Sequence, residues 1–299
     1  MAVAQQTATA KFNPLPHLPA PTRDLEQAKR DMDEYGCCVL ADVLTPEQVE
    51  RLLERTLDQA RAETANGVAS CESGAGKTVR YDNEGPNQRV WSLLNKGEEY
   101  RALAEHPATL EIIRHVLGQD VLLSSFTANI AGKGGEAMFM HQDQGSLPTT
   151  LTMPVVTNVA WVLSNYTDEG GATRIIPGSH KFGRPTPEEI APIETLPAAA
   201  PPGSAILFEG RTWHGTGKNI TNEPRVALLS FYCVPWLRQQ ENAVASISDE
   251  VLETASDELK ALLGFKTWNA LGGLDGHNTY GEPFTSRSRA PLGKMSVSE

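Results

Sequence analysis

The sequence has few features of a secreted or membrane-bound protein. Only four cysteines occur among its 299 residues, and no two of them form a C-x-x-C pair. This usage is typical of free thiols in a reducing compartment, and it favours a cytoplasmic location. No apolar run approaches the ~20 residues of a membrane-spanning helix. The first residues also lack the charged and apolar segments of a signal peptide.

Basic clusters are absent as well. Acidic residues outnumber Lys and Arg by 37 to 26, which gives a net charge of -11. This balance argues against non-specific nucleic-acid binding, and we expect a small-molecule substrate with neither a nucleic acid nor a membrane as partner. A homodimer is one arrangement that the sequence leaves open. The hydrophobic content of 40% is ordinary for a globular protein with a buried core.

A complete phosphate-binding loop is also missing. Gly74-Ala75-Gly76-Lys77-Thr78 resembles one, but the motif needs a glycine where Cys71 stands, and no strand pattern precedes it. Residues 66–90 are polar and rich in glycine. We therefore predict a mobile surface loop there, long enough to serve as a lid over a binding site.

The remaining pattern is mainly β with flanking helices, an α+β arrangement. Residues 1–21 are expected to be a disordered arm, and 22–299 one domain with a barrel core at about 120–237 and a helical or irregular extension at 238–299. Short apolar segments separated by turn signals predict the strands of a barrel or jelly roll. We expect strands at 37–40, 121–130, 157–163, 173–176, 203–208, 212–215 and 225–234, and helices at 22–36, after Thr45, at 98–117 with a break at Pro107, and at 248–264.

His141-Gln142-Asp143 is the stretch with the clearest chemistry. In an extended chain the side chains of His141 and Asp143 point to the same side. His214, between two expected strands, supplies a third ligand. Two histidines and one carboxylate on one face of a metal form the facial triad of non-haem Fe(II) oxygenases. The spacing alone also allows a zinc-dependent hydrolase or a non-enzymatic cupin-like binding protein, although no H-E-x-x-H motif is present.

Arg225 strengthens the metal-site hypothesis. It follows His214 across a turn, so a hairpin would bring it back beside that histidine. A guanidinium in an apolar strand is costly to bury without an anion. It could form a structural ion pair, or it could anchor a dicarboxylate cosubstrate through a bidentate fork.

These residues together resemble the phytanoyl-CoA dioxygenase family of Fe(II)- and 2-oxoglutarate-dependent oxygenases. The resemblance rests on His141-x-Asp143, on the segment from Gly171-Ala172-Thr173 to Pro177-Gly178-Ser179-His180, on Trp213-His214-Gly215-Thr216 and on Arg225. It extends from about residue 25 to 237. The segment at 33–40, where a helix ends at Gly36 before a strand, is similar to the family's opening.

The resemblance implies the fold, a double-stranded β-helix that forms a cupin-like jelly-roll barrel, and it also implies the cofactors and the site. His141, Asp143 and His214 would be the catalytic metal ligands, and O2 and 2-oxoglutarate would be consumed. Arg225, Thr173 and Thr216 would contact 2-oxoglutarate. Where some fungal members have glutamine three residues before the first histidine, this chain has Met138. We expect hydroxylation or another oxidation of a small molecule of specialised metabolism, with Gln144, Ser146 and Trp236 as candidate substrate contacts.

Overall fold

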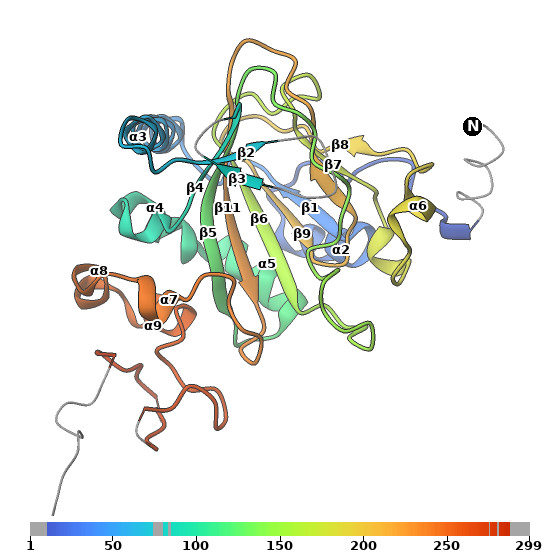
Figure 1. The fold of residues 1–299 in the computed structure, drawn as a ribbon. Helices are drawn as coiled ribbons and strands as arrows, with labels where there is room; N and C mark the ends of the chain where they lie inside the picture. Colours follow the sequence, from blue (N-terminus) through green and yellow to red (C-terminus); the bar gives the residue numbers. More distant parts are fainter. Residues whose placement is uncertain (1–10, 74–79, 83–84, 275, 280, 288–299) are drawn as a thin grey trace, which may run out of the picture.

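The computed structural model describes residues 11–73, 80–82, 85–274, 276–279 and 281–287. Within these ranges two β-sheets face each other, and helices cover the outer face of the larger one (Figure 1). The strands are β1 (Cys37–Leu40), β2 (Ser70–Ser73), β3 (Arg80–Asp82), β4 (Asn87–Val90), β5 (Leu122–Ala131), β6 (Val156–Val162), β7 (Thr173–Ile175), β8 (Leu196–Pro197), β9 (Ala205–Glu209), β10 (His214–Thr216) and β11 (Arg225–Cys233).

The larger sheet has the order β1-β9-β6-β11-β5-β4-β2-β3, and the smaller has the order β10-β7-β8. Neighbouring strands are antiparallel in both sheets. Two facing antiparallel sheets in this arrangement are a jelly roll. The predicted fold class, mainly β with flanking helices and a double-stranded β-helix, is therefore confirmed.

The central strands are buried on both faces, which explains their nearly continuous apolar sequence. On β6, Val159 and Trp161 pack into the core beneath the helices, whereas Ala160 and Val162 pack into a second cluster between the sheets. Successive strand residues point to opposite faces, so one strand contributes to both cores. Asn158 is on the same face as Ala160 and therefore looks toward the space between the sheets.

The helices are α2 (Leu25–Tyr35), α3 (Pro46–Ala65), α4 (Glu98–Ala104), α5 (Pro107–Leu117), α6 (Pro187–Ile190), α7 (Ala243–Ser246), α8 (Asp249–Thr254) and α9 (Asp257–Leu262), with short 3-10 turns η1 (Leu93–Asn95) and η2 (Ser179–Lys181). The predicted capping box is present at α3, where the Thr45 hydroxyl accepts from Gln48 N and the Gln48 side chain accepts from Thr45 N. None of the helices in the described ranges is long and apolar enough to cross a membrane.

Gly36 connects α2 to the larger sheet, and no other residue would fit there. Its φ of +73° is left-handed, and a Cβ at this position would lie 2.4 Å from both His180 Nδ1 and Thr212 Oγ1. The Gly36 carbonyl accepts from Glu209 N and from the Thr212 hydroxyl. The first helix is thereby fixed against the strand end that leads to His214.

Two segments differ from the sequence-based expectation. Residues 66–90 are not a simple loop, because β2 and β4 within them extend the larger sheet beyond β5. Their sequence lacks an apolar alternation, so only the pairing of β4 with β5 and of β2 with β4 reveals them as strands. The central residues of the proposed lid and of the phosphate-loop-like motif, 74–79, lie outside the described residues, as do 83 and 84.

The second difference concerns the N-terminal arm. Residues 1–10 lie outside the described residues, but 11–21 lie against the jelly roll. Leu15 N donates to Pro177 O, and Phe12 and Leu18 pack against two apolar clusters. This part of the arm is therefore held by apolar contacts, contrary to the expected disorder. The division into an arm and one domain at 22–299 stays a prediction.

Candidate functional site

The two candidate histidines are direct partners across an antiparallel bridge. His141 N donates to His214 O and His214 N donates to His141 O, both at 2.9 Å. This pairing attaches the segment that carries His141 and Asp143 to β10 of the smaller sheet. The imidazole rings consequently lie side by side, with centroids 4.4 Å apart.

Asp143 completes the cluster. Its Oδ1 lies 3.6 Å from the Nε2 atom of each histidine. Within the described residues, these three form the group of His, Cys, Asp and Glu whose ligand atoms converge, all within 4.8 Å of one another. The structure therefore brings together the three residues that the sequence selected as metal ligands.

The outer nitrogens of both histidines are held by backbone carbonyls. His141 Nδ1 donates to Phe139 O and His214 Nδ1 donates to Thr212 O, each at 3.0 Å. Because a carbonyl can only accept, the proton is at Nδ1, and the Nε2 lone pair faces the cluster. Fixing the tautomer in this way is typical of metal-binding histidines.

The charges within the cluster also suit a divalent cation. Burial would raise the pKa of Asp143, but the two histidines and the Asn158 amide outweigh it and lower that pKa to about 2. Burial lowers the pKa of His214 to about 4. For His141, burial acts in the same direction, but the hydrogen bond and charge of Asp143 prevail and raise its pKa. At neutral pH the cluster thus offers an ionised carboxylate and a neutral His214.

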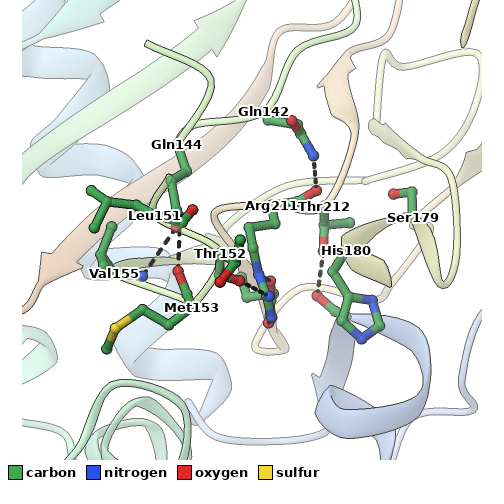
Figure 2. Close-up of polar contacts among 12 residues, drawn as sticks. Gln142, Gln144, Leu151, Thr152, Met153, Val155, Ser179, His180, Arg211 and Thr212 are labelled. Carbon is green, nitrogen blue, oxygen red and sulfur yellow. Dashed lines mark hydrogen bonds and ion pairs between the residues drawn. The ribbon is translucent and has the colours of Figure 1, made fainter. Parts of the chain in front are cut away.

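Gln142 and Gln144 alternate with the ligands along the chain, and Figure 2 shows the Gln142 side chain reaching Arg211 and the Gln144 side chain reaching Met153 and Val155. Gln142 Nε2 donates to the carbonyls of Arg211 and Gly183. Gln144 Nε2 donates to Met153 O at 2.8 Å, and its Oε1 accepts from Val155 N at 3.0 Å. Both side chains are buried. They attach the ligand segment to the turn before His214 and to the loop that leads into β6.

Arg225 lies at the start of β11 and is 2% exposed. Its Nε donates to Gly171 O at 3.1 Å, and its Nη1 donates to Asn129 O at 3.3 Å. Its guanidinium carbon lies 5.1 Å from the centre of the Tyr166 ring. The hydroxyl of Tyr166 in turn lies 2.7 Å from that of Thr173. Arg225 is thus connected to Thr173 through one aromatic residue.

Thr173 and Thr216 are opposite each other on β7 and β10. Thr216 shares its face of β10 with His214, two residues before it. Both threonines line the same cavity as the three candidate ligands. Five of the six residues selected from the sequence therefore line one cavity and come from three separate segments of the chain, whereas Arg225 is not among the wall residues.

The cavity has a volume of about 240 Å³ and opens to solvent. Apart from the candidate ligands and the two threonines, its wall includes polar side chains that the sequence analysis did not identify: Arg89, Ser125, Thr127, Asn129, Asn158 and Gln240. Alternation along β5 could have grouped Ser125, Thr127 and Asn129, but isolated Ser, Thr and Asn residues give no signal of their own. Of the candidate substrate contacts, Gln144 is buried behind the ligands, and neither Ser146 nor Trp236 is among the wall residues.

Comparisons with known proteins agree with this geometry. Residues 32–227 match the family described as Phytanoyl-CoA dioxygenase (PhyH). A relative named "Dioxygenase af480", from Aspergillus fumigatus, is 33% identical over 247 residues, which cover 81% of this chain and 77% of that protein.

Solved structures share the fold. The epimerase SnoN in complex with Fe3+, alpha ketoglutarate and nogalamycin RO has a TM-score of 0.56 and 19% identity, over 78% of this chain and 92% of SnoN. EvdMO1 has a TM-score of 0.58 and 20% identity over 71% of this chain. The match spans 50% of the EvdMO1 chain, about half its length.

Proposed function

The chain belongs to the phytanoyl-CoA dioxygenase family, and we propose that it hydroxylates or otherwise oxidises a small organic molecule and releases succinate and CO2. It is an Fe(II)- and 2-oxoglutarate-dependent dioxygenase by family and fold. The observation that carries the proposal is the cluster of two histidines and one aspartate at a solvent-accessible cavity. This donor set suits Fe(II), because it leaves several coordination positions for other ligands.

His141, Asp143 and His214 would hold the iron. Bound Fe(II) with 2-oxoglutarate supplies the activation of O2, coupled to oxidative decarboxylation of the cosubstrate and oxidation of the substrate. The protein contributes fixed geometry: both Nε2 lone pairs face the cluster because Nδ1 donates to a carbonyl. The Asn158 amide donates to Asp143 Oδ2 at 3.4 Å, which leaves Oδ1 toward the histidines.

Arg225 would bind the distal carboxylate of 2-oxoglutarate. Its position is supported by two backbone carbonyls and the Tyr166 ring, so the guanidinium is already oriented before any ligand arrives. Thr173 and Thr216 would add hydroxyl contacts from the cavity wall. This assignment explains why a cation is retained in an otherwise apolar strand.

The cavity favours a small substrate. Its volume of about 240 Å³ is below the ~300–1,000 Å³ of typical ligand pockets. Phe139, Leu229 and Phe231 supply apolar contact area on its wall. We therefore propose a compact, partly apolar molecule of specialised metabolism as the substrate.

Anaerobic titration tests the proposal. Apo-protein given Fe(II) and then 2-oxoglutarate should develop a weak visible charge-transfer band, and air together with a metabolite extract should then give substrate-dependent succinate. A zinc-dependent hydrolase or a cupin-like binding protein would give neither signal. Absence of the band in iron-loaded protein would refute the assignment of 2-oxoglutarate to this site.

A further inference from the structure

One wall of the cavity is a row of polar side chains on β5. Ser125 and Thr127 are alternate residues of that strand, so both face the cavity, and they are only 5% and 3% exposed. Their partners on β11, Phe231 and Leu229, line the same cavity. Each polar residue therefore stands beside an apolar one on the neighbouring strand.

The segment after β11 adds Gln240 to this wall, and its backbone is fixed on both sides. Gln239 Nε2 donates to Leu123 O at 2.8 Å, and Gln240 N donates to the Ser124 hydroxyl at 2.8 Å. Glu241 accepts from Ser92 N, the Ser92 hydroxyl and Phe126 N. These contacts hold the segment across the end of β5.

The Gln240 side chain is oriented by Ser125. The Ser125 hydroxyl donates to Gln240 Oε1 at 2.6 Å, which leaves the two N–H groups of Nε2 as donors at the cavity. Among the described residues, neither Gln240 Nε2 nor the Thr127 hydroxyl forms a hydrogen bond, although the Gln240 side chain is exposed and the Thr127 hydroxyl is not one of the enclosed polar atoms. Both groups line the cavity and remain available to hydrogen-bond with water or with a ligand.

The position of this wall relative to the metal cluster follows from strand register. Ser125 is opposite Phe231, and Phe231 is opposite Asn158, whose amide holds Asp143. Figure 1 shows β5, β11 and β6 side by side. Adjacent strands are about 4.8 Å apart, so the wall is about 10 Å from Asn158. A substrate held at the wall would extend over Phe231 toward the cluster.

We propose that Gln240, Ser125 and Thr127 form a subsite that binds an uncharged oxygen group, such as a carbonyl or hydroxyl, of the substrate. The proposal rests on the proposed function and deepens it by naming a substrate class. Gln240 and Phe231 lie beyond the family match, which ends at residue 227. The candidate metal ligands and Arg225 lie within the residues that match the family. The proposed subsite, by contrast, includes Gln240 from the chain that follows the match.

The charges on the cavity wall determine which class of substrate group the subsite would bind. Hydroxyl and amide groups are neutral, so a carboxylate buried against them would lack a compensating charge. Arg89 is the cation among the wall residues of this cavity, and it is opposite Asn129. Ser125 and Asn129 are four residues apart on one strand, or about 13 Å. Arg89 is therefore at the Asn129 end of the β5 row, Ser125 with Gln240 is at the other end, and Thr127 lies between them.

Three probes with the same six-membered ring test the subsite: cyclohexanone, methylenecyclohexane and cyclohexanecarboxylate. The full chain is loaded with Zn(II), which undergoes no redox chemistry, and with 2-oxoglutarate. Binding of each probe is measured by ligand-observed NMR titration, and 2-oxoglutarate affinity by calorimetry. If the metal-loaded wild-type protein fails to bind 2-oxoglutarate, the proposed function fails, independently of the probes.

Wild-type protein should bind cyclohexanone about two- to tenfold more tightly than methylenecyclohexane, the effect of one neutral hydrogen bond. Gln240→Leu and Thr127→Val should lower this ratio toward one, with 2-oxoglutarate affinity unchanged. Thr127→Ser keeps the hydroxyl and should keep the ratio. Gln119→Leu, the same change at an exposed glutamine outside the cavity, should behave as wild type.

Two results would overturn the subsite. One is an unaltered ratio in both Gln240→Leu and Thr127→Val. The other is preferential binding of cyclohexanecarboxylate that Arg89→Leu abolishes, because the cavity would then select an anion at the opposite end of β5.

Discussion

The segment from residue 141 to 144 has two faces with different tasks. His141 and Asp143 face the cavity and offer ligand atoms. Gln142 and Gln144 face the interior and donate to backbone carbonyls. The cavity face determines which chemistry can occur, because imidazole and carboxylate are metal ligands. The interior face determines where those ligands lie. Substitutions on the two faces should therefore have different effects on metal binding and turnover.

The largest effect is expected from the cavity face. His214→Ala removes one of three ligands and should abolish stoichiometric iron binding and turnover, while the fold persists because the alanine borders existing space. Iron analysis and circular dichroism measure the two properties. His277→Ala, at an exposed histidine, is the matched control. Full iron content and turnover in His214→Ala would exclude the proposed triad.

The cosubstrate contact should give the next largest effect. Arg225→Leu removes a buried cation and should weaken 2-oxoglutarate binding by about 30- to several-thousand-fold, the cost of one lost desolvated charge pair. Iron binding should persist, because Arg225 is not in the cluster. Calorimetric titration with Zn(II)-loaded protein measures both, with Arg238→Leu as an exposed control. An unchanged affinity would make Arg225 purely structural.

The interior face should have a smaller, graded effect. Gln142→Leu keeps all three ligands but removes the donors to the Arg211 and Gly183 carbonyls. Metal affinity should fall by about 10- to 100-fold, as is usual when groups that orient ligands are lost. Competitive Zn(II) titration gives the value, and Gln119→Leu serves as the control. Wild-type affinity in Gln142→Leu would show that backbone pairing alone positions the ligands.

The smallest effect concerns the protonation of His180, a buried histidine outside the metal cluster. Burial lowers the pKa of His180, whose Nε2 lies 3.2 Å from Asp33 O. Below the ordinary histidine pKa of about 6.5 the unfolded chain binds a proton that the folded protein resists. The free energy of unfolding should therefore fall as pH decreases from 7.5 to 5.5, by at most about 1.4 kcal/mol per pH unit from this group.

Urea unfolding of metal-free protein at both pH values measures this loss, and an NMR titration of His180 assigns it. Burial also lowers the pKa of His106, which packs against Trp161 with ring centroids 5.4 Å apart. The titrations of His106, of His214, whose pKa burial lowers to about 4, and of His141, whose pKa is raised, in the same spectra separate their contributions from that of His180. An ordinary titration of His180 near pH 6.5 would contradict the assignment.

Local signals in the sequence predicted elements whose geometry depends on neighbouring residues. Thr45, Pro46 and Gln48 indicated the start of α3, and Pro107 indicated the break between α4 and α5. Alternation placed His141 and Asp143 on one side of an extended segment. The same criterion could not predict the strands within residues 66–90. β2 and β4 have no apolar alternation and become strands only by pairing with the rest of the sheet.

The sequence by itself determined the proposed chemistry of this protein: it supplied the residue types predicted to act at 141, 143, 214 and 225, and the jelly-roll pattern that holds them. Only the tertiary structure decided which neutral side chains share their cavity. Ser125, Thr127 and Gln240 are ordinary residues in sequence, and they become a wall because β5, β11 and the following segment meet there. The reason is physical: a metal ligand is recognisable from its chemistry, whereas a hydrogen-bonding surface exists only where separate segments converge.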